Sequence, residues 1–209
     1  MRNALIITSS AQAGESVSGR LAREFEAQLT AAHPGVRIVR RDVGADTIPH
    51  LTAETVAAIR GTPETAAERS ARALSDTLVS ELQRADLIVI ASPMYNFGMS
   101  STLKTWFDHV LRAGVTFRYS ESGPEGLLKN KKAVVIESRA GLYSGDGPAA
   151  AMDSQEPHIR TLLSFMGVDN VAWVRAEKLA FGPDMAKDSI EGAIAELRDL
   201  AGQSLALAA

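Results

Sequence analysis

Short apolar segments alternate with longer amphipathic segments along the chain. In the first amphipathic segment, Leu21, Phe25, Leu29 and Ala32 recur at spacings of three and four residues, which places them on one face of a helix. Candidate strands cover residues 4–9, 37–42, 86–91, 132–138 and 171–176. This alternation is typical of parallel strands joined by crossover helices, so the sequence predicts an α/β protein.

Apolar periodicity also predicts helices on both sides of the third strand. Leu74, Leu78 and Leu82 precede that strand, and Trp106 and Val110 follow it. Further helices are expected at residues 157–166 and 185–202. Right-handed crossovers then give, as the simplest solution, one domain over residues 1–209, with a doubly wound five-stranded parallel sheet in the order 2-1-3-4-5 and helices on both faces.

Two segments are longer than a simple connection requires, residues 44–68 and residues 114–130. Loops of this length are usually functional or disordered. In the second segment Phe117 and Tyr119 alternate with polar neighbours, which favours a short hairpin.

Composition excludes several classes of function. The 209 residues contain no cysteine, which excludes thiolate metal sites, a thiol nucleophile and disulfides, and the four histidines have no metal-binding spacing, so no metal is expected. A net charge of −3 offers no surface for nucleic acid or anionic membrane. No segment approaches the roughly 20 apolar residues of a membrane span, so we expect a soluble, cytoplasmic protein.

A serine-rich loop follows the first strand and opens a helix at about Gly19. Ser10, Ser16 and Ser18 supply hydroxyl groups next to the free N–H groups and the positive dipole end of that helix. This combination predicts a phosphate site without a lysine. The alternative is that Ser16 or Ser18 only caps the helix. The Walker, dinucleotide-binding and nucleophile-elbow patterns are all missing here.

The loop after the third strand carries the most informative residues. Pro93 cannot continue a sheet ladder, and a turn with an amide and two aromatic side chains precedes Ser100 or Ser101, either of which can cap the next helix. Such a loop suits a flat, hydrogen-bonding heterocycle. In the predicted strand order it meets the serine-rich loop where the order reverses, which is where doubly wound sheets bind ligands.

Four segments together carry a specific family resemblance, which extends over nearly the whole chain. They are Ser92-Pro93-Met94-Tyr95-Asn96-Phe97, Arg112-Ala113-Gly114-Val115-Thr116-Phe117-Arg118-Tyr119, Gly123-Pro124-Glu125-Gly126 and Glu137-Ser138-Arg139-Ala140-Gly141. The chain resembles the FMN-dependent NADH:quinone oxidoreductases, also called FMN-dependent NADH-azoreductases. The resemblance implies a flavodoxin-like fold, an FMN cofactor and a homodimer.

The resemblance also assigns roles by position. It implies that Ser10, Ser16, Val17 and Ser18 hold the FMN phosphate, that Met94, Tyr95, Asn96 and Phe97 line the isoalloxazine, and that Ser138, Arg139, Ala140 and Gly141 close on its pyrimidine end. Relatives commonly read Ser-Arg-Gly-Gly in the last loop, so Ala140 is a departure, and we expect its backbone to be in an allowed region. Arg139 is either a surface charge or a group that stabilises the reduced ring. Tyr119, Phe117 and Arg60 are the substrate-pocket candidates.

The implied reaction is a two-electron reduction of quinones and azo compounds. NADH or NADPH passes a hydride to flavin N5 and leaves before the acceptor binds, so ping-pong kinetics are expected and no catalytic side chain is assigned. The rival hypothesis is a flavodoxin-type electron carrier without its own substrate, which a balance of 25 acidic and 22 basic residues disfavours. A non-flavin scaffold protein of the same fold is the weaker alternative.

Overall fold

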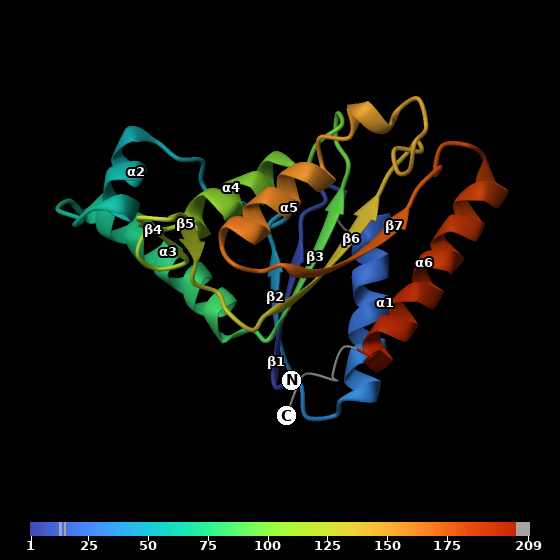
Figure 1. Cartoon of the computed structure of the whole chain (residues 1–209), viewed down its shortest axis with the longest axis horizontal. Coiled ribbons are helices and arrows are strands. Elements are labelled where there is room, and N and C mark those ends of the chain that lie inside the picture. The colour runs from blue at the N-terminus through green and yellow to red at the C-terminus, as the bar shows by residue number, and fades with distance from the viewer. Residues whose placement is uncertain (13, 15, 204–209) are drawn as a thin grey trace.

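A five-stranded parallel sheet forms the centre of the computed structural model, which describes residues 1–12, 14 and 16–203. Its strands lie in the order β2 (Arg37–Asp42), β1 (Asn3–Thr8), β3 (Leu87–Pro93), β6 (Lys132–Ser138) and β7 (Asn170–Ala176). All four neighbouring pairs are parallel (Figure 1). This is the predicted order, with the two strands of a separate hairpin inserted before β6 in the chain.

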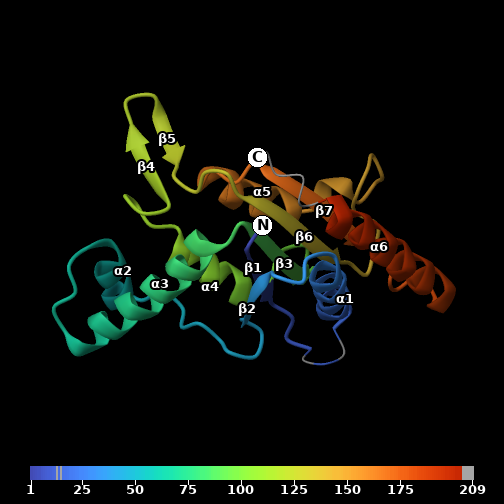
Figure 2. The ribbon, with the colours of Figure 1, turned by 90° about the horizontal axis from the view of Figure 1, so that it is seen from below.

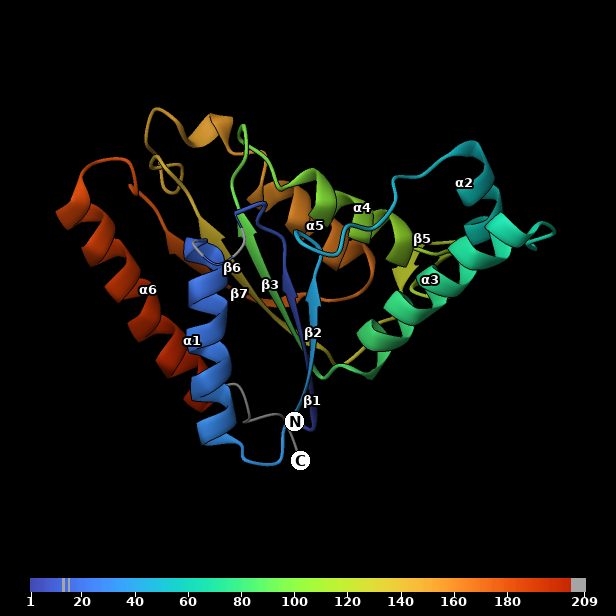
Figure 3. The same ribbon diagram turned by 180° about the vertical axis from the view of Figure 1, so that it is seen from behind.

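Helices cover both faces of the sheet, as predicted (Figure 3). On one face lie α1 (Val17–Ala32) and α6 (Pro183–Gln203), and on the other lie α3 (Ala66–Arg84), α4 (Ser101–Val110) and α5 (Glu156–Phe165). Successive strand residues point to opposite faces. Ile6 and Val89 therefore join the core beneath α1 and α6, whereas Ile7 and Ile88 join the core beneath the other helices.

The two long segments have different structures. Residues 44–68 contain a helix that we did not predict, α2 (Ala53–Arg60), and the first turn of α3. Both helices begin with a capping box, at Thr52 and at Thr65. The hairpin predicted near Phe117 is confirmed as the antiparallel pair β4 (Phe117–Ser120) and β5 (Gly123–Gly126), which projects away from the sheet (Figure 2).

A short 3₁₀ turn, η1 (Ala150–Met152), precedes α5. None of the helices in the described part of the chain is long and apolar enough to cross a membrane.

Candidate functional site

Three loops leave the carboxyl ends of β1, β3 and β6 at one edge of the sheet, because these strands are neighbours and parallel. Tyr95 connects the first two loops. Its hydroxyl oxygen lies 3.2 Å from the Ser10 hydroxyl and accepts a hydrogen bond of 3.2 Å from the Ala11 N–H. The serine-rich loop and the turn after β3 therefore meet, as the predicted strand order required.

The β1–α1 loop ends in a capped helix start. The Ser16 hydroxyl accepts a hydrogen bond of 3.2 Å from the Gly19 N–H, and it lies 3.1 Å from the hydroxyl of Ser18, which is fully buried. Ser16 is thus a helix cap, as the alternative interpretation stated. The N–H groups of Val17 and Ser18 belong to the first turn of α1 and have no intrahelical acceptor. Ala13 and Glu15 lie outside the described residues.

The loop after β2 packs closely against the β1–α1 loop. A Cβ atom added to Gly44 would lie 2.1 Å from the carbonyl oxygen of Ser10. The Asp42 carboxylate fixes the backbone of the loop after β2, because it accepts hydrogen bonds from the N–H groups of Gly44 and Ala45 at 3.0 and 3.2 Å. Only glycine fits this position without displacing backbone.

The β3–α4 loop forms a tight turn closed by two backbone hydrogen bonds. Tyr95 N–H donates to the Gly98 oxygen at 2.9 Å, and Gly98 N–H donates to the Tyr95 oxygen at 3.1 Å. Asn96 and Phe97 between them have φ values of 48° and 71°, the pattern of a type I′ turn. Positive φ is uncommon for a bulky residue and costs of order 1 kcal/mol, and such strain concentrates at functional sites. Ser100 caps α4, as one of the two predicted candidates.

Contacts from the β6–α5 loop fix this turn in place. Met94 N–H donates to the Ser138 oxygen at 2.9 Å, and the Phe97 oxygen accepts from the Ser154 N–H at 2.9 Å. The Phe97 ring, 41% exposed, packs edge-on against Tyr143 with centroids 6.1 Å apart. The turn thus presents two exposed side chains, those of Asn96 and Phe97, from a fixed backbone.

The burial of Arg139 excludes one of the two sequence-based interpretations of its side chain. It is fully buried, so it is not a surface charge, and its guanidinium contacts carboxylates. Its nitrogens lie 2.7 Å from Glu137, 3.0 Å from Asp153 and 3.2 Å from Glu177. Burial alone would lower the pKa of Arg139, but these carboxylates outweigh burial and raise it. Arg139 is therefore the centre of a buried ion cluster.

Glu177, which pairs with Arg139, also forms hydrogen bonds to the loop that follows Arg139. Its carboxylate accepts hydrogen bonds from the N–H groups of Tyr143 and Ser144, at 2.9 and 3.1 Å, and from the Ser144 hydroxyl. Burial works to raise the pKa of Glu177, but these bonds and Arg139 leave it below its usual value. A Cβ added to Gly141 would lie 3.0 Å from the Tyr143 ring, so this residue is also confined.

The departure from the usual loop sequence at Ala140 is accommodated. Ala140 is not among the residues with positive φ, which confirms the expectation of an allowed backbone region. Its carbonyl oxygen accepts a hydrogen bond of 3.0 Å from the Ala180 N–H, which joins this loop to the segment after β7.

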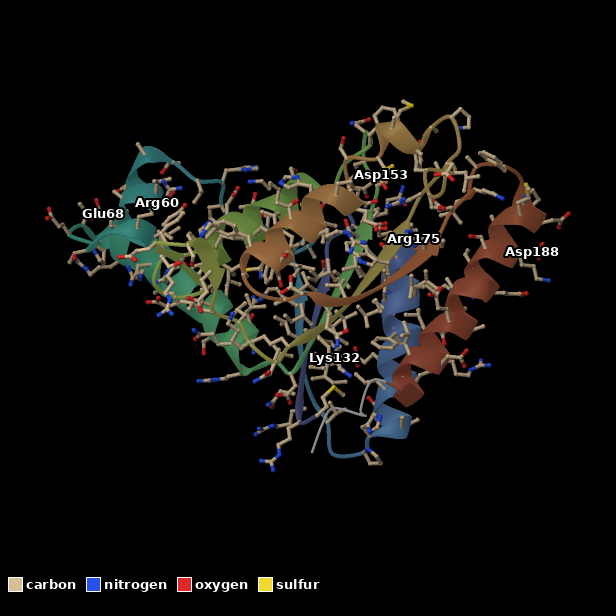
Figure 4. The ribbon with its side chains drawn as sticks, viewed as in Figure 1. Arg60, Glu68, Lys132, Asp153, Arg175 and Asp188 are labelled. Carbon is tan, nitrogen blue, oxygen red and sulfur yellow. The ribbon has the colours of Figure 1, made fainter. Side chains whose placement is uncertain are left out.

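The substrate-pocket candidates are not brought to the three loops within one chain. Tyr119 is 73% exposed on the projecting hairpin, while Phe117 is buried against Phe165 with ring centroids 4.6 Å apart. Arg60 ends α2 at the far end of the molecule from Asp153 (Figures 2 and 4). Within one chain, the hairpin and α2 therefore lie away from the three loops.

Comparison with known proteins gives consistent results. A family model described as a flavodoxin-like fold matches residues 2–201. An FMN-dependent NADH:quinone oxidoreductase of Hyphomonas neptunium is 53% identical over 96% of this chain and 96% of its own length. An FMN-dependent NADH:quinone oxidoreductase of Pseudomonas aeruginosa is 44% identical over 95% of this chain and 92% of its own length.

The chain belongs to the family of the FMN-dependent NADH:quinone oxidoreductases. A crystal structure of an azoreductase from Bacillus anthracis superimposes with a TM-score of 0.89 at 28% identity, covering 97% of this chain and 100% of that one. The family assignment made from the four sequence segments is thereby confirmed.

Sequence reasoning missed four polar residues of the site, of which Glu137, Gln155 and Glu177 are buried and Asp153 is partly buried. One of them left a signal in the sequence. Glu137 interrupts the apolar run of β6, and a carboxylate inside a buried strand requires a partner. The other three lie outside any apolar run, so no local pattern marks them.

Glu137 predicts a specific pH dependence of stability. Burial raises its pKa to about 7, despite the charge of Arg139, and its second oxygen has no hydrogen-bond partner among the described residues. Arg175 also faces it at 3.7 Å, and the Glu156 and Asp153 charges oppose its ionisation. The folded protein therefore binds the proton of the Glu137 carboxyl more tightly than the unfolded chain does. This difference stabilises the folded state fully below about pH 4.5, and the stabilisation is lost as the pH rises through about 7.

We expect the Tm to fall between about pH 4.5 and 7, and the variant Glu137→Gln, which is neutral throughout, to flatten that slope. The control is Asp86→Asn. Burial of Asp86 opposes its ionisation, but backbone N–H donors outweigh this and lower its pKa, so it titrates only in acid. The variant Asp86→Asn should therefore leave the slope of the Tm against pH unchanged. Equal slopes for Glu137→Gln and the parent protein would show that Glu137 does not titrate in this range.

Proposed function

We propose that this protein is an FMN-dependent NAD(P)H:quinone oxidoreductase that also reduces azo compounds. Tyr95 joins the start of α1, whose first N–H groups have no intrahelical acceptor, to a strained turn at the point where the strand order reverses, and this observation carries the proposal. A relative 53% identical over nearly the whole chain has the corresponding name.

The described residues fit FMN. Ser10 and the N–H groups of Val17 and Ser18 would hold the phosphate, with Ser16 fixing the helix start. Met94, Tyr95, Asn96 and Phe97 would line the ring, where Asn96 offers an exposed amide and Phe97 an exposed apolar surface. Ser138, Ala140, Gly141 and the backbone of Arg139 would close on the pyrimidine end.

Bound FMN supplies two-electron transfer, as a hydride taken from NADH or NADPH and delivered to a quinone or azo acceptor. The protein contributes binding and orientation, and we assign no side chain as nucleophile. One pocket serves donor and acceptor in turn, which gives ping-pong kinetics with parallel double-reciprocal lines. Because reduced nicotinamide is an intracellular electron donor, we place the reaction in the cytoplasm.

Stopped-flow mixing of the FMN-loaded protein with NADH tests the proposal. We expect direct bleaching of the flavin absorbance, followed by its return when a quinone is added. A flavodoxin-type carrier would bind FMN but show no bleaching by NADH alone. Purified protein that fails to take up FMN would contradict both functions.

We also propose a homodimer with a shared site. One chain keeps the exposed Tyr119 of its hairpin and Arg60 of α2 away from its own three loops, so these residues can reach a substrate only at a second copy of the chain. Twofold association is the commonest oligomeric state of soluble proteins. Sedimentation should give the dimer mass, and full activity at the monomer mass would exclude a shared site.

A further inference from the structure

Gln155 lies between two of the site loops and is fully buried. Its Nε2 donates hydrogen bonds of 3.1 Å to both the carbonyl oxygen and the hydroxyl of Ser92. Its Oε1 accepts a hydrogen bond of 3.2 Å from Nε of Arg139. The side-chain amide thus joins the last residues of β3 to the first residue after β6.

The side chain of Gln155 has no local role in α5. It precedes α5, but its side chain makes no capping hydrogen bond. Asp153 caps the helix instead, because its Oδ1 accepts from the N–H groups of Gln155 and Glu156 at 2.8 and 3.1 Å. The inward direction of the Gln155 side chain is therefore explained only by its contacts with Ser92 and Arg139.

The chemistry at the two ends requires an amide. Ser92 presents a carbonyl oxygen, which needs a donor, and Arg139 presents an N–H, which needs an acceptor. A glutamate would supply only the acceptor when ionised, and a methionine of similar length supplies neither. Buried groups without partners are destabilising, so this position selects glutamine.

The two loops joined in this way are those proposed to meet the flavin ring. Ser92 is followed by Pro93, which has no N–H, and then by the strained turn at Asn96 and Phe97. Arg139 begins the loop proposed for the pyrimidine end. A shift of Ser92 relative to Arg139 would change the gap between these loops, and a ring held edge-on depends on that gap.

We propose that Gln155 is a positioning residue that sets the spacing of the two ring-binding loops and thereby the affinity for the flavin ring. This inference rests on the proposed function, because it assumes that FMN occupies the site. Gln155 acts through Ser92 and Arg139 and need not touch the ring.

The test compares FMN with riboflavin, which has the same ring without the phosphate, by quenching of flavin fluorescence. We expect Gln155→Met to raise the Kd for both ligands about tenfold, the equivalent of one buried hydrogen bond. The ratio of the two Kd values should stay that of the parent protein, because the phosphate end is unchanged. Gln155→Glu keeps the acceptor for Arg139 and loses the donor for Ser92, so it should weaken both ligands as well.

Ser75→Ala is the matched control for stability. Ser75 is equally buried, and its hydroxyl bonds the His109 carbonyl and Arg112 between α3 and α4, which are not part of the three loops. It should lower the Tm without changing either Kd. Parent-like affinities in Gln155→Met, or a loss for FMN alone, would overturn the inference. A parent protein that binds neither flavin would instead overturn the proposed function.

Discussion

Replacing Arg139 by methionine is expected to lower the free energy of unfolding by about 3–5 kcal/mol, the usual effect of removing one partner from a buried ion pair. The loss arises because the buried carboxylates of Glu137 and Glu177 and the partly buried carboxylate of Asp153 would lose the guanidinium. Protonation of Glu137, whose pKa burial already raises to about 7, relieves part of this repulsion. The loss should therefore be smaller at pH 6 than at pH 8.

Urea unfolding of the flavin-free protein measures this effect. The control variant is Arg118→Met, which removes an exposed pair with Glu125 on the hairpin, worth about 0–1 kcal/mol. The flavin-free protein separates the two possible roles of Arg139. If Arg139→Met left its stability unchanged and weakened only FMN binding, Arg139 would be a flavin ligand and not the centre of an ion cluster.

The variant Gly44→Ala is expected to raise the Kd for FMN about 10- to 100-fold. The added methyl group would meet the Ser10 carbonyl oxygen at 2.1 Å, so the backbone of one of the two loops must move. Overpacking of this kind costs about 1–3 kcal/mol, and each 1.4 kcal/mol corresponds to about tenfold in affinity. The displaced loop carries Ser10 and leads to the start of α1, where the phosphate is proposed to bind.

Gly35→Ala is the matched control for this variant. Gly35 lies at the other end of β2, and a Cβ there has no atom within 4 Å. Its FMN affinity should equal that of the parent protein. Riboflavin, which lacks the phosphate, should lose less affinity than FMN in Gly44→Ala. If both variants bound FMN like the parent protein, the loop after β2 would not support the phosphate site.

Local features of the sequence predicted the strand order, the family and the end of the sheet at which the candidate site lies. Apolar runs predicted the five sheet strands, and the hairpin at Phe117 and the cap at Ser100 were also found. Such features are readable because periodicity and capping depend on residues within one or two turns of each other. The helix α2 was missed although Thr52 and Thr55 form a local capping box, so its signal was present but not used.

Only the tertiary structure revealed what surrounds Arg139. Its partners come from β6, from the segment before α5 and from the residue after β7, at positions 137, 153 and 177, so no sequence window contains them together. The same holds for Gln155, which lies 63 residues from Ser92, and for Gly44, whose need for glycine comes from the backbone at Ser10. The sequence alone determined the sheet strands, most of the helices and the turn after β3, because short-range periodicity and turn residues encode them. Folding alone decided which charges became buried neighbours, because burial depends on segments that are distant in the chain.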